Sequence, residues 1–256
     1  MTLNNALLMI VLMLWQAVAW ADSTEWSVPV SANSISYQQD AYQYDARMAF
    51  LKAGELSLAM SRMGENYEVA GEFRTSRAMS AYYTWNGLFA AVGTWDVTGP
   101  VTKAYMARTT GKDEELKIVL TSEEGSRVLE GPEGEFEQLQ KPGGIDLISA
   151  LFFSPVCYTG GQVHDGEDTY QLALQSERTH NYNGGRGYYK GEVTSCDYHV
   201  VDHKNRKRRV IVSLADVDGN RVAVQVRAKI PIFPDAVFRL RHQPPVHSDQ
   251  HLAGMD

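Results

Sequence analysis

Two histidine pairs have the spacing of metal ligands. His199 and His203 are four residues apart, and so are His247 and His251, each pair with aspartates nearby. Imidazoles at that spacing can hold one ion when they share a helix face, whereas on a strand they lie about 13 Å apart. Because neither segment has a helical pattern, we predict solvated surface histidines, and we predict neither a metal site nor another cofactor.

An acidic cluster lies around Gly166, where Asp165, Glu167 and Asp168 follow one another closely. Paired carboxylates can act as acid and base in glycoside hydrolysis. A turn rich in acids is more often simply solvated, and no Gly-x-Ser-x-Gly nucleophile motif occurs in the chain. The sequence therefore predicts no catalytic residue.

Cys157 and Cys196 are the two cysteines of the chain. In an oxidising compartment an even pair indicates one disulfide, here closing a loop of about 40 residues and worth roughly 4 kcal/mol. Two buried free thiols are the alternative. A thiol nucleophile with a distant histidine would also be possible chemistry, but a disulfide explains the pair more simply.

A basic run, Lys204–Arg209, contains five cations in six residues. It could meet an anionic envelope surface, such as lipid headgroups or an acidic partner. We favour the alternative, an exposed loop whose charges discourage pairing at a sheet edge. The net charge of the whole chain is −7, which argues against a nucleic-acid partner because phosphate binding needs a positive field.

Residues 1–21 differ from the rest of the chain. An apolar run from Leu7 to Leu14 is followed by small residues at 17, 19 and 21. This pattern predicts a secretory signal peptide cleaved before Asp22, and hence a periplasmic mature chain without a transmembrane segment. An uncleaved anchor is the alternative, but the apolar stretch of 16 residues is short for a membrane span.

Apolar residues recur at every second position in three segments between Tyr42 and Thr75, which predicts three antiparallel strands. A three-residue loop at 52–54 would place Phe50 opposite Leu56 and Met48 opposite Leu58. A similar loop at 217–219 would place Leu214 opposite Val222 and Val212 opposite Val224. Gly54 and Gly219 would then adopt the left-handed conformation that such loops require.

The rest of the chain also favours strands, with one helix. Alternation or turn residues predict strands at 88–95, 101–108, 115–121, 126–129, 169–178, 187–201, 209–215, 221–230 and 236–241, and a short helical or irregular connection at 77–85. Asp146 is placed to cap a short apolar helix that ends before Pro155 and would plug one end of the sheet.

The expected fold is therefore all-β, with an antiparallel barrel-like, half-barrel or β-spiral domain, or a sandwich, and one short helix near its mouth. This single domain spans residues 42–241. A polar lead-in at 22–41 precedes it, and a polar tail at 242–256, which we expect to be disordered, follows it.

Five segments resemble a family of bacterial envelope proteins catalogued as domain of unknown function 3108. They are YDARMAFLKAGELSLAM, AYYTWNG, IDLISALFF, VHDGEDTYQL and LADVDGNRV. The positions of Cys157 and Cys196 also fit, and the resemblance covers about residues 42–241. One departure is Leu147, where the family would have proline after the capping aspartate. The resemblance implies an architecture related to periplasmic β-spiral and lipoprotein-carrier folds, and it implies no catalytic residue.

Two functions remain open. The first is a non-enzymatic periplasmic protein that binds a lipid, an acyl chain, a hydrophobic peptide or an envelope partner. The second is an envelope hydrolase that acts on cell-wall or polysaccharide material. Aromatic and methionine residues could line an apolar cavity or form a packed core, and the candidates for the inner face are Met48, Phe50, Leu58, Met60, Phe73, Trp85 and Phe89.

Overall fold

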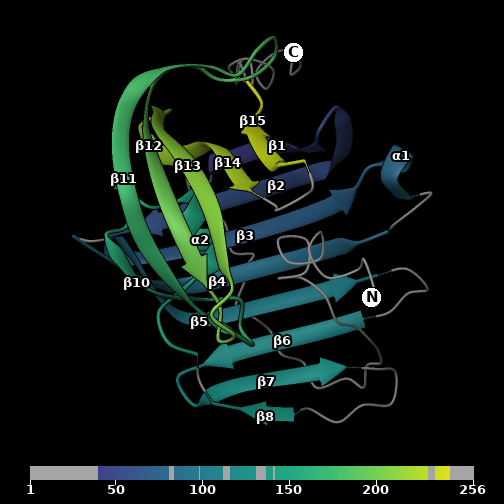
Figure 1. The fold of residues 1–256 in the computed structure, drawn as a ribbon. Helices are drawn as coiled ribbons and strands as arrows, with labels where there is room; N and C mark the ends of the chain where they lie inside the picture. The colour runs from purple at the N-terminus through teal and green to yellow at the C-terminus, as the bar shows by residue number, and fades with distance from the viewer. Residues whose placement is uncertain are drawn as a thin grey trace, which may run out of the picture.

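Strands make up most of the chain in a computed structural model, which describes residues 40–80, 84–97, 99–111, 116–130, 137–140, 142–229 and 234–242 (Figure 1). The all-β prediction is confirmed. The predicted signal peptide, nearly all of the lead-in and almost the whole tail lie outside the described residues, as do His247 and His251.

The strands are β1 (Asp40–Met48), β2 (Leu51–Met63), β3 (Asn66–Thr75), β4 (Asn86–Asp96), β5 (Gly99–Thr110), β6 (Leu116–Ser122), β7 (Gly125–Glu130), β8 (Glu137–Leu139), β9 (Ile145–Asp146), β10 (Gly160–His164), β11 (Thr169–Asn183), β12 (Lys190–Val201), β13 (Lys207–Val217), β14 (Asn220–Lys229) and β15 (Ala236–Leu240). The helices are α1 (Arg77–Ser80), within the predicted irregular connection, and α2 (Leu147–Phe152). Neither helix in the described part of the chain is long and apolar enough to cross a membrane.

All of these strands belong to one sheet, in the order β8-β7-β6-β5-β4-β3-β2-β1-β15-β14-β13-β12-β11-β10-β9. Strands β1 to β8, the first meander, run outward to one edge. Strands β9 to β15, the second meander, begin at the other edge and return inward, so that β15 pairs with β1 in the middle. The pairs are antiparallel except for β9 with β10. The sheet is open, with β8 and β9 as its edges.

The length of one connection shows that the sheet must curl. Only residues 140–144 join β8 to β9, although these strands lie at opposite edges of a 15-stranded sheet. Such a link reaches about 20 Å when extended, whereas a flat sheet of this width would separate its edges by about 67 Å. The second meander accordingly arches over the first (Figure 1), and β9 contacts β5.

Helix α2 lies in the core that this curvature encloses. Four of its six residues, Ser149, Ala150, Leu151 and Phe152, are buried. The Phe152 ring packs on Tyr44 of β1 and on Phe238 of β15, with ring centroids 5.1 and 6.0 Å apart. Asp146 caps the helix as predicted, because its side chain accepts a hydrogen bond from the Ser149 N–H. The expected position near a mouth stays a prediction, because the sheet is open; the structure places α2 against inner-face rings of β1 and β15.

The predicted register of the first hairpin is wrong. The turn consists of Ala49 and Phe50, with Ala49 in the left-handed conformation at φ 52°, and Met48 pairs with Leu51. Tyr44, not Phe50, is therefore opposite Leu56. Gly54 lies within β2 at an irregularity of the ladder, where a side chain would overlap the Phe73 ring. Gly54 is needed for this close approach and not for a turn.

The predicted register of the second hairpin is also wrong, although Gly219 is left-handed as expected, at φ 86°. Asp218 is left-handed too, at φ 52°, so Asp218–Gly219 is a two-residue turn and Val217 pairs with Asn220. Leu214 consequently faces Ala223. A further irregularity next to Leu214 places Val212 opposite Val226 instead of Val224.

Candidate functional site

An aromatic cluster lines the inner face of the sheet at the end where β1 finishes. The Phe73 ring lies 4.9 Å from the Trp85 ring and 6.3 Å from the Phe238 ring, measured between centroids. Trp85 in turn lies 6.1 Å from Phe89. Because Phe238 also contacts Phe152 of α2, the cluster joins both meanders to the helix.

Small residues in the strands make room for these rings. At Gly87, a Cβ atom would lie 2.7 Å from the Phe89 ring and 2.9 Å from the Trp85 ring, closer than real Cβ contacts. The rings therefore lie directly against the bare backbone of β4. Alternation along the strands points Phe73 and Phe89 inward, and the glycine allows them to approach.

The predicted inner-face residues divide into three groups. Leu58, Met60, Trp85 and Phe89 are buried, at 1–5% exposure, and belong to the core. Met48 and Phe73 are half-buried. Phe50 is 82% exposed in the β1–β2 turn and does not reach the inner face, because the shorter turn leaves it outside the ladder. The candidates for the inner face did not include three aromatic partners in the cluster and its surroundings, Tyr44, Phe152 and Phe238.

The acidic turn, Asp165–Asp168, lies against the inner face of β5, β6 and β7 and is not simply solvated. The Gly166 carbonyl oxygen accepts hydrogen bonds from the hydroxyl groups of Thr121 and Ser126. Gly166 has φ 98°, and a side chain there would overlap Val119 and Tyr105. The turn thus connects the second meander to the first.

A buried lysine holds the same turn from the other side. Lys117 Nζ lies 2.8 Å from a carboxylate oxygen of Glu130 and 2.5 Å from one of Glu167, and its side chain is only 7% exposed. A cation removed from water in this way needs close counter-charges. Glu167 is therefore engaged in an ion pair between the meanders, and nothing marks it as a free catalytic carboxylate.

Asp165 organises the acidic turn internally. One carboxylate oxygen accepts hydrogen bonds from the backbone N–H groups of Glu167 and Asp168, at 3.1 and 2.9 Å. The other accepts a hydrogen bond from the Tyr170 hydroxyl at 2.8 Å. Burial raises the pKa of Asp165 to about 6, although these hydrogen bonds oppose the rise.

The histidines in the described part of the chain do not assemble with acids into a metal centre. In the described residues, no three His, Cys, Asp or Glu side chains come together as a metal site would require. His199 lies on β12, and His203 lies in the following turn, where its Nδ1 is 3.3 Å from an Asp168 carboxylate oxygen. His164 packs edge-on against the Tyr105 ring.

Part of the basic run is neutralised locally. Asp202 accepts hydrogen bonds from the backbone N–H groups of Lys204 and Arg206, and its carboxylate lies 2.6 Å from Arg206 Nε. Arg209 Nε donates to both carboxylate oxygens of Asp197, at 2.9 and 3.0 Å. Two of the five cations are thus paired with aspartates. The predicted exposed loop covers only the first half of the run, because residues 207–209 already belong to β13.

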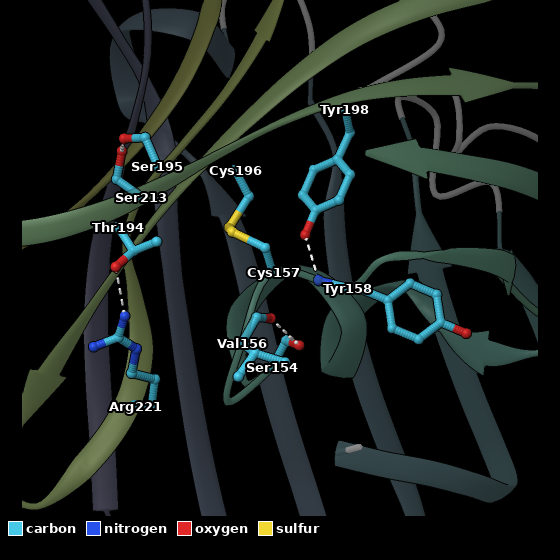
Figure 2. The surroundings of a disulfide bond; sticks show 10 residues. All are labelled: Ser154, Val156, Cys157, Tyr158, Thr194, Ser195, Cys196, Tyr198, Ser213 and Arg221. Carbon is cyan, nitrogen blue, oxygen red and sulfur yellow. Dashed lines mark hydrogen bonds between the residues drawn. A yellow bond between two sulfur atoms is a disulfide. The ribbon is translucent and has the colours of Figure 1, made fainter. Parts of the chain in front are cut away.

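The predicted disulfide between Cys157 and Cys196 is confirmed (Figure 2). It joins the segment after α2 to the buried face of β12, with the two Cα atoms 5.4 Å apart. Beside it, the Tyr158 N–H donates a 2.7 Å hydrogen bond to the Tyr198 hydroxyl. Burial raises the pKa of Tyr198 to about 12, so this hydroxyl is neutral at physiological pH.

A polar group that the sequence did not indicate lies on the outer face, at the centre of the sheet. Asp45 is 8% exposed and accepts hydrogen bonds from the Tyr188 hydroxyl at 2.7 Å and from Arg241 Nε at 3.0 Å. Lys52 Nζ lies 2.9 Å away. Although burial opposes it, these partners lower the pKa of Asp45 to about 2. These contacts of Asp45 attach the tip of the β11–β12 hairpin, through Tyr188, to β1.

Comparisons with protein-family models, with curated proteins and with solved structures give no significant match for this chain. The resemblance to domain of unknown function 3108 is therefore neither supported nor contradicted, and the functional argument depends on the geometry of the site.

Proposed function

We propose that this chain is a non-enzymatic envelope protein that binds an apolar ligand, either a lipid, an acyl chain or a hydrophobic peptide. The observation that carries the proposal is the facing pair of half-buried rings, Phe73 from β3 and Phe238 from β15. Three strand spacings separate these strands in the sheet order, yet the rings meet because the sheet curls. The open sheet would then work as a half-barrel with an aromatic inner surface.

The chemistry of this end suits an acyl chain. Met48 and Ala236 are cross-strand neighbours that lie beside Phe238 and are also half-buried. Methionine and aromatic side chains adapt to apolar partners of varied shape. Each methylene group removed from water contributes about 0.8 kcal/mol, so micromolar binding, about 8 kcal/mol, needs burial of about ten or more methylene groups, as a long acyl chain provides. The mechanism would be shielding of the ligand from water, with no bond made or broken.

Export to the periplasm is part of the proposal. It rests on the predicted signal peptide at 1–21, and a disulfide between Cys157 and Cys196 suits an oxidising compartment. An envelope protein or the cell wall remains the alternative partner. A hydrolase is the less favoured function, because the carboxylates of the acidic turn are already engaged by Lys117, Tyr170 and backbone N–H groups.

The test compares two phenylalanines in the exported chain. Phe73→Gln should weaken the binding of cis-parinaric acid, a fluorescent fatty acid, by about tenfold or more, because a polar amide replaces an aromatic contact. Phe50→Gln is the matched control, since this ring lies outside the cluster, and it should leave binding unchanged. Thermal melting of both variants verifies folding. If the unaltered protein binds no fatty acid, and native mass spectrometry finds no co-purified lipid or peptide, the proposal fails.

A further inference from the structure

Three arginines lie together on the outer face of the central strands, opposite the aromatic cluster. Arg47 of β1 and Arg227 of β14 are both cross-strand neighbours of Val237 on β15, one on each side. Arg239 lies two residues further along β15. The Cα atoms of Arg47 and Arg227 are thus about 10 Å apart, and that of Arg239 is about 7 Å from Val237. Side chains as long as arginine can converge on one small group across these distances.

The charges of these arginines are poorly compensated. In the described chain, no carboxylate oxygen lies within ion-pair distance of Arg47 or Arg239. Arg47 donates a 3.0 Å hydrogen bond to the neutral Phe50 carbonyl group. Arg227 lies 3.8 Å from Asp235, whose same oxygen is only 2.9 Å from Lys229.

The nearby acids are already used by other cations. Asp45 is held by Arg241 and Lys52, and both of these also contact Glu55. Among the described residues around the three arginines, three carboxylates (Asp45, Glu55 and Asp235) therefore face six cations, in a protein whose net charge is −7. The excess comprises Arg47, Arg227 and Arg239, and it forms a local positive field on an acidic molecule.

Two tyrosines show that the guanidinium groups converge. Burial raises the pKa of Tyr182, while the charges of Arg239 and Arg227 act to lower it. Burial and Asp45 raise the pKa of Tyr188, while Arg47 acts to lower it. Arg239 also lies over the Tyr188 ring, 5.9 Å from its centroid. The three cations are therefore gathered around two hydroxyl-bearing rings.

The guanidinium groups also have unused hydrogen-bonding capacity. The Nε atoms of Arg227 and Arg239 are buried and have no acceptor in the described chain. A buried donor without an acceptor costs about 1–3 kcal/mol. These two Nε atoms are themselves inaccessible, so an external anion would contact the terminal nitrogen atoms of the same guanidinium groups.

We propose that Arg47, Arg227 and Arg239 form a binding site for a phosphate-bearing ligand. Guanidinium groups bind phosphate through paired, charge-assisted hydrogen bonds, for which a lone ammonium group is a poor substitute. The phosphate belongs either to a phospholipid headgroup or to a soluble phosphate ester. The site is independent of the proposed apolar site, because the two lie on opposite faces of the sheet. It is also distinct from the conspicuous basic run.

The experiment measures binding of the exported chain to glycerol phosphate by calorimetry, and to vesicles of phosphatidylglycerol in phosphatidylcholine by sedimentation. Arg239→Gln, Arg47→Gln and Arg227→Gln should each weaken binding by about tenfold at low salt. Arg239→Lys should recover only part of the lost binding, because lysine restores the positive charge but lacks the planar guanidinium group that donates paired hydrogen bonds. Arg209→Gln is the matched control, because Asp197 already neutralises that cation, and it should change binding by less than about twofold.

The two ligands distinguish the sources of phosphate. Binding to glycerol phosphate supports a soluble ester, and binding to the anionic vesicles alone supports a headgroup. The proposal is overturned if neither binds at low salt, or if Arg209→Gln weakens binding as much as Arg239→Gln does. Because phosphatidylcholine itself carries a phosphate, vesicles of an uncharged galactolipid show whether the apolar site alone accounts for attachment. Melting curves of every variant confirm that the sheet is intact.

Discussion

At the scale of single residues, Asp45 and Asp165 show how surroundings set the charge of a carboxyl group. Asp45 is buried and Asp165 is half-buried, but Asp45 has cationic partners, whereas the hydrogen bonds to Asp165 come from neutral donors. The pKa of Asp45 accordingly falls to about 2, and the pKa of Asp165 rises to about 6. An ionised Asp45 therefore stabilises the fold at neutral pH, whereas an ionised Asp165 destabilises it.

Asp165→Asn should stabilise the protein at pH 7.5 by about 1–3 kcal/mol. Between the ordinary value of 3.8 and the raised value of about 6, the folded state holds the proton of Asp165 more tightly than the unfolded state. The contribution of this group to the free energy of unfolding is thus complete below pH 3.8 and is lost as the pH rises to about 6. Asparagine keeps an acceptor for the turn and cannot ionise. Urea unfolding at several pH values measures the difference.

The gain from Asp165→Asn should shrink as the pH falls and vanish below about pH 4. Asp168→Asn is the control, because it removes a charge from the same turn and leaves the accepting carboxylate oxygens of Asp165 in place. A gain that is equal at pH 4 and pH 7.5 would show that packing, and not ionisation, sets the effect.

At the scale of elements, the sequence predicted where strands occur but not how they pair. Alternation located the strands because one face of each is buried. The predicted registers were wrong because Ala49 and Asp218 adopt left-handed conformations. The predictions had assigned left-handed conformations only to glycines. The long β11 was expected to end at 178, since its exposed second half has no inward face to give a pattern.

The aromatic cluster and the arginine site show the same contrast between residues that a sequence pattern indicates and contacts that only the fold creates. Phe73, Trp85 and Phe89 were predicted because they alternate within or beside strands. Phe238 and Phe152 were not, because their contacts depend on a curl that brings distant segments together. The arginine site combines residues 47, 227 and 239, so no linear motif could indicate it. The basic run attracts attention in the sequence, but two of its cations are paired with aspartates.

Helix α2 depends on Asp146 more than a surface helix depends on its cap. Asp146 is fully buried, accepts from the Ser149 N–H at 2.8 Å and accepts from the Thr102 hydroxyl at 2.7 Å. Asp146→Ala should cost about 2–4 kcal/mol, from the lost cap and from donors left without an acceptor. Asp146→Asn should recover most of this stability, because its amide oxygen can still cap the helix. Chemical denaturation compares the two, and equal losses would contradict this role.

At the scale of the whole molecule, the fold is two meanders that share one core. They are joined by the β1–β15 pair, by α2 and by the acidic turn, each of which connects residues far apart in sequence. None of these contacts is local, so neither meander can bury its inner face alone. This arrangement explains why the sequence contains no domain boundary within the sheet. It also implies that the described fold unfolds as one cooperative unit.

The double variant Cys157→Ser, Cys196→Ser tests whether the two meanders unfold together. The disulfide spans 39 residues, so its loss should cost about 4 kcal/mol and lower the melting temperature by about 8–16 °C. Both cysteines lie in the second meander, whereas Trp85 and Trp95 lie in the first. If the core is shared, tryptophan fluorescence and far-ultraviolet circular dichroism should shift together. Reduction of the unaltered protein is the control for the serine side chains. Two separate transitions, with the fluorescence midpoint unmoved, would show instead that the meanders fold independently.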